Sequence, residues 1–329
     1  MAANRSKISR IVRAVGPFLI LAFVLGFFAV IMNADSRGTF FSLYNFKTIL
    51  TQTVIVAIGA LGMTMIIVSG GIDLSVGSAI ALTSIIGAVM INQNHSVPAV
   101  IGICIVVGAS VGLVNGVIIA GFGMTPFIVT LGMLGIARGM AKKIANNQTV
   151  NFPSDDAVHA VGRLMMDPNP GSWAISPGIL AAIVLAVLTS ILMQRTIFGR
   201  YIFAIGSNEA TARLCGVRTR LNKVAIYTVA GMLFGVAGMM QLSRLRQGDP
   251  STAIGIELDI IAAVVIGGAS LNGGTGSILG SMIGALTMAV LRSGSIQSDW
   301  PNYMQEIIIG IVIILAVGLD KWRQSRATA

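Results

Sequence analysis

The stretch that decides the fold is residues 48–91, which read TILTQTVIVAIGALGMTMIIVSGGIDLSVGSAIALTSIIGAVMI. It contains two long apolar runs, residues 48–72 and 74–91, that only Asp73 separates. A helix that crosses a bilayer needs about 20 mainly apolar residues, with a range of about 17 to 25. We therefore expect two transmembrane helices joined by a short polar break around Gly70 to Asp73.

The composition of the whole chain agrees with a membrane protein. Of the 329 residues, 55% are hydrophobic and only 10% are charged, whereas about 25% are charged in ordinary soluble domains. So few polar side chains cannot cover a surface that faces water. The net charge of +10 does not indicate a nucleic-acid partner, because the cations lie in short gaps between apolar runs and not on a folded basic domain.

Six apolar runs are long enough to cross a bilayer. They are residues 15–32, 48–72, 74–91, 97–120, 173–194 and 224–243. Four weaker spans are expected. Arg138 interrupts the run in residues 127–137, so this span is short, tilted, or carries its cation near an interface; the others are two helices in residues 260–291 and one in residues 302–319. The sequence predicts an all-α polytopic membrane protein with about ten transmembrane helices, some short or broken, in a single transmembrane domain over residues 1–329.

The distribution of cations predicts the orientation. More than half of the 22 lysines and arginines lie in the N-terminal segment, in residues 195–223 and in the C-terminal tail. An even number of spans places these three segments on one side of the membrane. Because cytoplasmic loops retain lysine and arginine, we expect both termini and residues 195–223 in the cytoplasm.

A second polar break is expected in residues 267–277, where two glycines precede Asn272. This segment resembles residues 69–78, since each places a glycine pair before a polar break and a glycine-spaced helix after it. Transporters are often built from such repeats, with broken helices at the substrate path. Glycines at every fourth position also predict close helix packing within the chain; they are Gly108, Gly112 and Gly116, and Gly276, Gly280 and Gly284.

The chain offers little for catalysis. It has no Gly-Lys pair, so it lacks the phosphate-binding loop of many ATPases. It has only two histidines, His95 and His159, both in polar segments between apolar runs, and only two cysteines. A metal site or a catalytic triad would have almost no residues to draw on, so we expect no catalytic residues, no metal site and no bound cofactor. Asp73 is the most unusual carboxylate, and it fits either a transport path or the N-terminal cap of the next helix.

The polar segment 195–223 predicts a short cytoplasmic helix. Ser207 or Asn208 can cap its start, Glu209 suits its positive first turn and Gly216 can end it. Such an amphipathic helix has two uses. It can lie on the anionic lipid of the inner leaflet, or it can dock into a groove of a partner protein.

These residues also carry a family resemblance. The pattern Glu-Ala followed by glycine after five residues, at Glu209, Ala210 and Gly216, resembles the cytoplasmic coupling loop of permease subunits of binding-protein-dependent ABC importers. Four further stretches are similar to the branch for ribose, xylose, arabinose and galactose. They are residues 70–77, Asn115-Gly116, residues 125–132 and Phe198-Gly199-Arg200.

The resemblance implies a non-catalytic permease subunit of an ATP-driven importer that moves a ribose-type or xylose-type monosaccharide across the bacterial inner membrane. It further implies three protein partners: a second permease copy, identical or paralogous, a cytoplasmic ABC ATPase that holds ATP and Mg, and a periplasmic sugar-binding protein. The residues expected to couple to the ATPase are Glu209, Ala210, Arg213 and Gly216. The residues expected along the translocation path are Ser69, Gly70, Gly71, Asp73, Asn115, Thr125, Phe127, Gln241 and Asn272.

Other functions remain open at this point. A permease of the same family can carry a branched-chain amino acid, a nucleoside or an autoinducer. A secondary transporter driven by an ion gradient is the alternative from another class. A membrane-embedded enzyme is disfavoured because histidines, cysteines and carboxylates are scarce, and a channel has no need of a capped cytoplasmic helix.

Overall fold

The computed structural model describes residues 2–153, 155–165, 175–301 and 303–311, together with the isolated positions 314 and 318. The helices are α1 (Ala2–Ile31), α2 (Ala34–Phe40), α3 (Leu43–Val68), α4 (Val76–Asn92), α5 (Val97–Phe122), α6 (Pro126–Ile144), α7 (Asp155–Gly162), the 3-10 helix η1 (Arg163–Met165), α8 (Pro177–Arg195), α9 (Ile197–Ser207), α10 (Glu209–Leu214), α11 (Thr219–Leu245), α12 (Ile256–Ile266) and α13 (Ile278–Gln297). Residues 303–311 are also helical. Strands β1 (Val150–Asn151) and β2 (Gln247–Gly248) form one short antiparallel pair.

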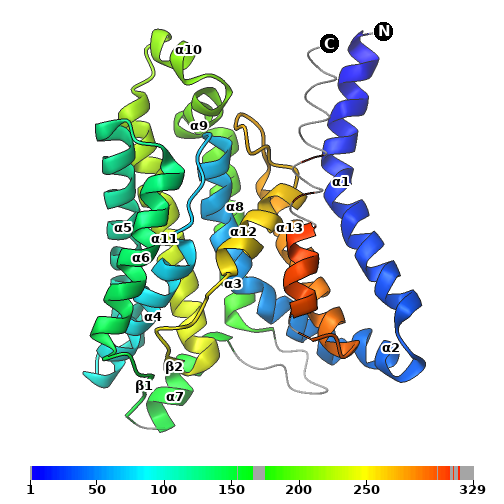
Figure 1. Cartoon of the computed structure of the whole chain (residues 1–329), viewed down its shortest axis with the longest axis vertical. Helices are drawn as coiled ribbons and strands as arrows, with labels where there is room; N and C mark the ends of the chain where they lie inside the picture. The colour runs from blue at the N-terminus through cyan, green and yellow to red at the C-terminus, as the bar shows by residue number, and fades with distance from the viewer. Residues whose placement is uncertain are drawn as a thin grey trace.

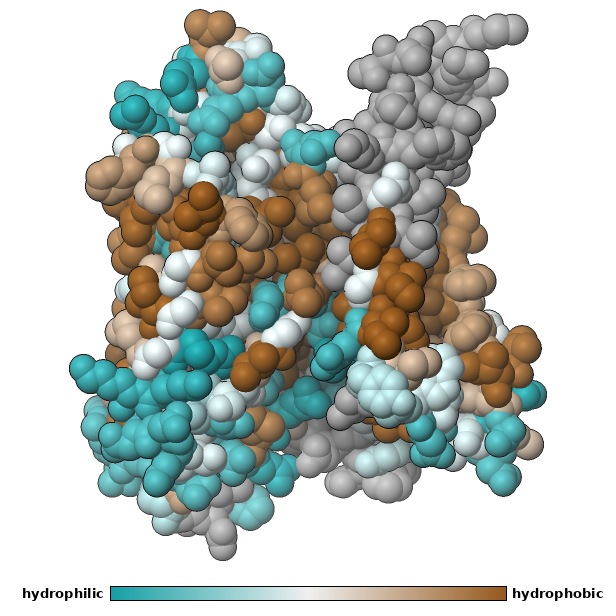
Figure 2. All heavy atoms as spheres, viewed as in Figure 1, coloured by the Kyte–Doolittle hydropathy of each residue, from teal (hydrophilic) through white to brown (hydrophobic). Residues whose placement is uncertain are grey.

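The helices form a membrane-spanning bundle. Five of them, α3, α5, α8, α11 and α13, are long and apolar enough to cross a bilayer, and α4, α9 and the part of α1 over Val15–Ile31 are shorter apolar helices. Figure 2 shows apolar side chains in a band across the middle of the bundle and hydrophilic side chains toward its two ends. The predicted all-α polytopic fold is confirmed.

Helix α3 is the centre of the bundle. It contacts α11 on one side and α12 and α13 on another, while α1 packs mainly against α13. The start of α1 lies at the same end of the molecule as α9 and α10, whereas α7 and the β1–β2 pair lie at the opposite end (Figure 1). The arrangement agrees with the prediction that the N-terminus and residues 195–223 share one side. The C-terminal tail lies outside the described residues.

The predicted close packing of glycine-bearing helices is present between α5 and α11. A Cβ atom at Gly108 would lie 2.7 Å from the backbone nitrogen of Gly235, and one at Gly112 would lie 3.1 Å from the Cα of Gly231. The α5 glycines therefore serve packing within the chain, as predicted, and bring α5 and α11 close to the break between α3 and α4.

Two of the weaker spans are now defined by the structure. Helix α6 is not a short helix that stops at Arg138 but one that carries this cation, since it continues to Ile144. Nη1 of Arg138 donates to the carbonyl oxygens of Pro250 at 2.9 Å and Thr252 at 2.6 Å, which provides acceptors for the cation within the chain. The split in residues 260–291 is present, but α12 has only 11 residues. At about 1.5 Å per residue it is too short to cross a bilayer.

Candidate functional site

The break between α3 and α4, residues 69–75, begins with a glycine turn. Gly70 has a φ of +84°, a conformation that glycine adopts without steric cost. The N–H groups of Gly70 and Gly71 donate to the carbonyls of Ile67 and Ile66, both at 2.9 Å. These bonds satisfy carbonyls that the end of a helix leaves free. We refer to residues 69–75 as the first break.

Asp73 organises the second half of the first break. Its Oδ1 accepts hydrogen bonds from the backbone N–H of Ser75 at 2.7 Å and from the hydroxyl of Ser75 at 2.6 Å. Ser75 is itself the N-cap residue of α4. The prediction that Asp73 caps α4 is therefore wrong in detail, because Asp73 holds the residue at the cap position and does not occupy that position.

Side chains from two other helices close over the first break. Nδ2 of Asn115, on α5, donates to Oγ of Ser75 at 3.0 Å and lies 3.4 Å from Oδ2 of Asp73. Oγ1 of Thr130, on α6, accepts from the backbone N–H of Leu74 at 3.1 Å. Asn115 is a predicted residue and Thr130 is not, although Thr130 lies in the quoted stretch 125–132 as a polar residue in an apolar run.

Tyr227 of α11 completes this group and has no sequence signal, since it is one aromatic residue in an apolar helix. Its side chain packs against Gly71, where any Cβ would collide with Oη. Among the described residues, Oη of Tyr227 and Oδ1 of Asn115 have no hydrogen-bond partner. We define the Asp73 cluster as Asp73, Ser75, Asn115, Thr130 and Tyr227, all at most 2% exposed.

The carboxylate of Asp73 has no ion pair within the described part of the chain. An ionisable side chain buried at membrane depth is costly and is by default a candidate for function. The Asp73 cluster is therefore the first candidate site, and it offers carboxylate, amide and hydroxyl groups, the types that bind hydroxyl-rich solutes.

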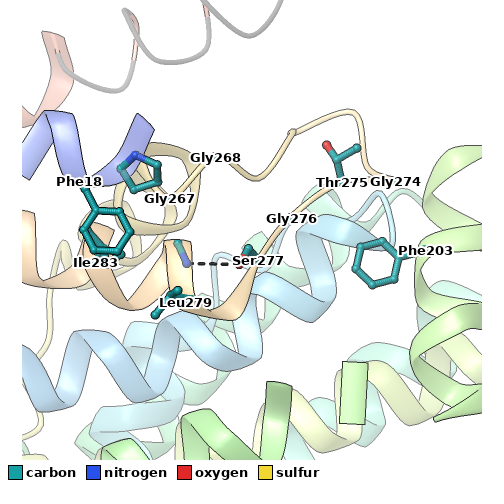
Figure 3. Close-up of a pocket in the computed structure, with 12 residues that line it drawn as sticks. Phe18, Phe203, Gly267, Gly268, Gly274, Thr275, Gly276, Ser277, Leu279 and Ile283 are labelled. Carbon is teal, nitrogen blue, oxygen red and sulfur yellow. Dashed lines mark hydrogen bonds between the residues drawn. The ribbon is translucent and has the colours of Figure 1, made fainter. Parts of the chain in front are cut away.

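The second break, residues 267–277 between α12 and α13, is built differently. Three of its glycines have positive φ: Gly268 at +86°, Gly273 at +85° and Gly274 at +74°. Its backbone N–H groups donate to carbonyls of the segment itself, for example from Ser270 to Thr275 at 3.1 Å, and to carbonyls of α12 and α3. Oγ of Ser277 accepts from the N–H of Gly280 at 3.4 Å and caps α13 (Figure 3).

A crevice of about 390 Å³ opens beside the second break. Pro17 and Phe18 of α1 line one side of it, and Phe203 of α9 lines another. Figure 3 shows Phe18 and Phe203 at opposite sides of the view with residues 274–277 running between them. The second break therefore borders open space, whereas Asp73 and Ser75 of the first break are buried in protein.

The predicted cytoplasmic helix is present as α10. Oδ1 of Asn208 accepts from the backbone N–H of Thr211 at 2.9 Å, so Asn208 is the cap. Gly216 has a φ of +83°, and its N–H donates to the carbonyl of Arg213 at 3.0 Å, which ends the helix. The preceding helix α9 is not predicted by the sequence analysis, because it is short and contains Arg200.

Glu209 ties α10 to α11. Its Oε2 lies 2.6 Å from Nζ of Lys223, and its Oε1 lies 3.5 Å from Nη2 of Arg213. Partial burial acts to raise the pKa of Glu209, but the hydrogen bond and charge of Lys223, followed by the charge of Arg213, outweigh it and hold this pKa below its ordinary value. Glu209 is therefore ionised at neutral pH.

Helix α10 presents an apolar side chain at its outer end. Leu214 is 89% exposed, and the side chain of Arg213 is 65% exposed. An exposed leucine beside a cation at the tip of a capped helix is suited to a groove in a partner protein. Leu214 is a residue that the sequence analysis missed, because one leucine in a polar segment carries no signal without its exposure.

The predicted path residues occupy four places. Ser69, Gly70, Gly71, Asp73 and Asn115 lie together at the first break, and Asn272 lies in the second break. Thr125 and Phe127 lie at the start of α6, where Phe127 is 51% exposed. Gln241 is buried on α11, where its Nε2 donates to Oγ1 of Thr252 at 2.5 Å.

The chain is similar to known proteins over most of its length. Residues 45–317 match the family described as "Branched-chain amino acid transport system / permease component". The chain is 37% identical over 290 residues to the ribose import permease protein RbsC of Escherichia coli K12, covering 87% of this chain and 88% of that one. It is 32% identical over 341 residues to the galactose/methyl galactoside import permease protein MglC of Haemophilus influenzae, covering 99% of each.

A third relative is the L-arabinose ABC transporter permease protein AraH of Azospirillum brasilense, which is 34% identical over 286 residues, covering 87% of this chain and 82% of that one. No solved structure matches the chain. With its apolar helices, the chain is a multi-pass protein of the bacterial inner membrane. It belongs to this family of ABC importer permeases.

Proposed function

We propose that this chain is the non-catalytic permease subunit of an ATP-driven importer of a monosaccharide, in the class that includes ribose, galactose and arabinose. The relatives named for these three sugars support the substrate class. The observation that carries the proposal is the capped helix α10, which presents Leu214 and Arg213 outward and is tied by Glu209 to a membrane-spanning helix. Such a helix is suited to bind a separate ATPase subunit and to transmit its movement to the membrane helices.

The partners follow from the two ends of the bundle. A cytoplasmic ABC ATPase that holds ATP and Mg docks on α10, with Leu214 in an apolar groove. A periplasmic sugar-binding protein docks at the opposite end, where α7 and the β1–β2 pair lie (Figure 1). A second permease copy, identical or paralogous, completes the pathway.

The route of the motion is short. Closure of the ATPase displaces α10, and the ion pair between Glu209 and Lys223 passes the displacement to α11. Helix α11 contacts α3, α4 and α5, and its residue Tyr227 belongs to the Asp73 cluster. A sugar is uncharged, so its path needs hydroxyl and amide groups; the candidates in this chain are Ser69, Asn115, Thr125, Gln241 and Asn272.

The test is uptake into vesicles that contain the permease, the ATPase and the binding protein. We expect Glu209→Lys, which repels Lys223, to lower uptake by more than about tenfold, the factor that 1.4 kcal/mol represents, with normal membrane levels. Gly216→Val should act in the same direction, because valine is strained at a φ of +83°. Asp35→Lys, an exposed change in α2, is the control and should transport normally. Full uptake by both α10 variants would refute the coupling role.

The same vesicles separate the alternatives. Uptake should stop when ATP is removed and survive an uncoupler, and the reverse result would indicate a secondary transporter. Ribose, galactose and arabinose should be accumulated in preference to leucine or a nucleoside. Accumulation of leucine alone or of a nucleoside alone would leave the family assignment in place but refute a monosaccharide as the substrate.

A further inference from the structure

We propose that a junction of four glycines joins α9 to both helix breaks, so that α9, the first break and the second break move as one body during transport. The glycine junction consists of Gly70 in the first break, Gly206 in α9, and Gly273 and Gly274 in the second break. The inference rests on the proposed function and names the part of the chain that receives the movement of α10.

The contacts of the junction are between backbones. The N–H of Gly274 donates to the carbonyl oxygen of Val68 at 2.8 Å, which joins the second break to the end of α3. Gly206 lies against this hydrogen bond, since a Cβ there would lie 2.6 Å from the nitrogen of Gly274 and would collide with the oxygen of Val68.

The remaining contacts bring in Gly70 and Ser207. A Cβ at Gly273 would lie 2.7 Å from the oxygen of Gly206 and 3.0 Å from the Cα of Gly70. One at Gly274 would lie 2.7 Å from Oγ of Ser207. Three segments that are distant in the sequence therefore meet with their backbones in direct contact.

Gly206 shows that the contact itself requires glycine. Gly70, Gly273 and Gly274 have positive φ, which alone favours glycine. Gly206 lies within α9 and its φ is not positive, and alanine is a much better helix former than glycine. The close approach to Val68 and Gly274 is the physical reason for glycine at this position.

A backbone contact transmits displacement directly. Long side chains can absorb a movement by changing rotamers, whereas close-packed backbones resist compression and pass strain on. Helix α10 begins two residues after Ser207, so a displacement of α10 also reaches the junction along the chain, in addition to the ion pair with α11. The crevice also borders Pro17 and Phe18 of α1, which is not part of the body, and so provides neighbouring space into which the body can shift (Figure 3).

The first experiment disrupts the backbone contact at Gly206 by adding a Cβ atom. Gly206→Ala should leave ATP hydrolysis by the assembled complex in place and lower uptake per ATP hydrolysed by more than about tenfold, equivalent to the 1.4 kcal/mol step. Gly132→Ala in α6 is the matched control, because a Cβ there meets nothing within 4 Å, and it should transport normally. Normal uptake per ATP by Gly206→Ala would overturn the proposal.

The second experiment keeps the contact and prevents it from opening. Ser207 and Thr275 are exposed beside the junction, so Ser207→Cys and Thr275→Cys can be joined by a short reducible bifunctional thiosulfonate, in a Cys215→Ser background that removes the exposed native thiol. At complete linking, verified by mass, we expect unchanged ATP-driven uptake. Uptake that is lost on linking and recovered on reduction would show that the junction opens in each cycle and would overturn the proposal.

The second experiment still tests the proposal if the first variant cannot be studied. If Gly206→Ala does not reach the membrane, the linking experiment decides, because its side chains are exposed and its controls are the single-cysteine variants. The wild type in the same vesicles tests the proposed function separately. A wild type without ATP-driven sugar uptake refutes that function, whereas a transporting wild type with contrary variants refutes only the junction.

Discussion

The two helix breaks have similar sequences and different supports. The first break is held by side chains of α5, α6 and α11, and Asp73 at its centre is 1% exposed. The second break is held by backbone hydrogen bonds to its own carbonyls and to those of α12 and α3, exposes Asn272 and Thr275, and borders a crevice. A glycine-rich interruption alone therefore does not set mobility. Polar side chains from neighbouring helices hold the first break, so we interpret it as the more firmly anchored part of the body that the glycine junction forms. The second break borders the crevice, and we interpret it as the part of that body that opens locally more easily.

The largest effect should come from removing the anchor. Asp73→Ala takes the acceptor away from two donors of Ser75, and each buried unpaired donor costs about 1–3 kcal/mol. We expect a large fall in the midpoint of thermal unfolding in detergent. Asp73→Asn keeps one acceptor oxygen and should cost less. The matched change in the second break, Thr275→Ala at an exposed side chain, should stay within about 0.5 kcal/mol of the wild type. Equal losses at both breaks would remove the distinction.

The next effect concerns the space beside the second break. Leu279 lines the crevice and is 63% exposed, so Leu279→Trp fills the space without displacing the core. We expect uptake to fall by about fivefold, equivalent to about 1 kcal/mol, at an unchanged unfolding midpoint. Leu180→Trp on α8, at a leucine that is 53% exposed, is the control for adding an indole ring. Uptake equal to that of the control would show that the crevice is not used for movement.

A smaller and more local difference should appear in hydrogen exchange. Local opening is easiest where buried apolar contacts are few and backbone hydrogen bonds face solvent. The amides of residues 268–276 should therefore exchange faster than those of residues 70–75, by about tenfold or more, since 1.4 kcal/mol of local stability gives tenfold. Mass spectrometry of peptides from the protein in detergent measures this. Faster exchange in the first break would reverse the expected order of local stability.

Much of this comparison is visible in the sequence, because its signals are local. The apolar runs, the two glycine interruptions and the caps of α10 at Asn208 and Gly216 each lie within a few adjacent residues. The resemblance of residues 69–78 to residues 267–277 also identified both breaks. These features fix the fold class and the position of the coupling helix.

The rest depends on contacts between distant segments. Arg138 can lie inside α6 because carbonyls more than a hundred residues away accept its hydrogen bonds. Thr130 and Tyr227 join the Asp73 cluster only because α6 and α11 fold over the first break. Gly206 looks like an ordinary helix glycine until Val68 and Gly274 are placed against it. No local pattern contains this information.

The smallest effect lies outside the membrane, where the paired carboxylate of Glu209 contrasts with Asp73. The pKa of Glu209 is lowered from 4.5, so its ion pair stabilises the fold above that pH and is lost as the pH falls through the folded-state value. The pair is partly exposed and is worth at most about 1 kcal/mol. We expect Glu209→Gln to unfold slightly earlier than the wild type at neutral pH and together with it in acid, with Lys223→Gln as the matched variant. A difference that persists in acid would mean that packing and not charge holds α10 to α11, and the coupling helix would then resemble the anchored first break instead of contrasting with it.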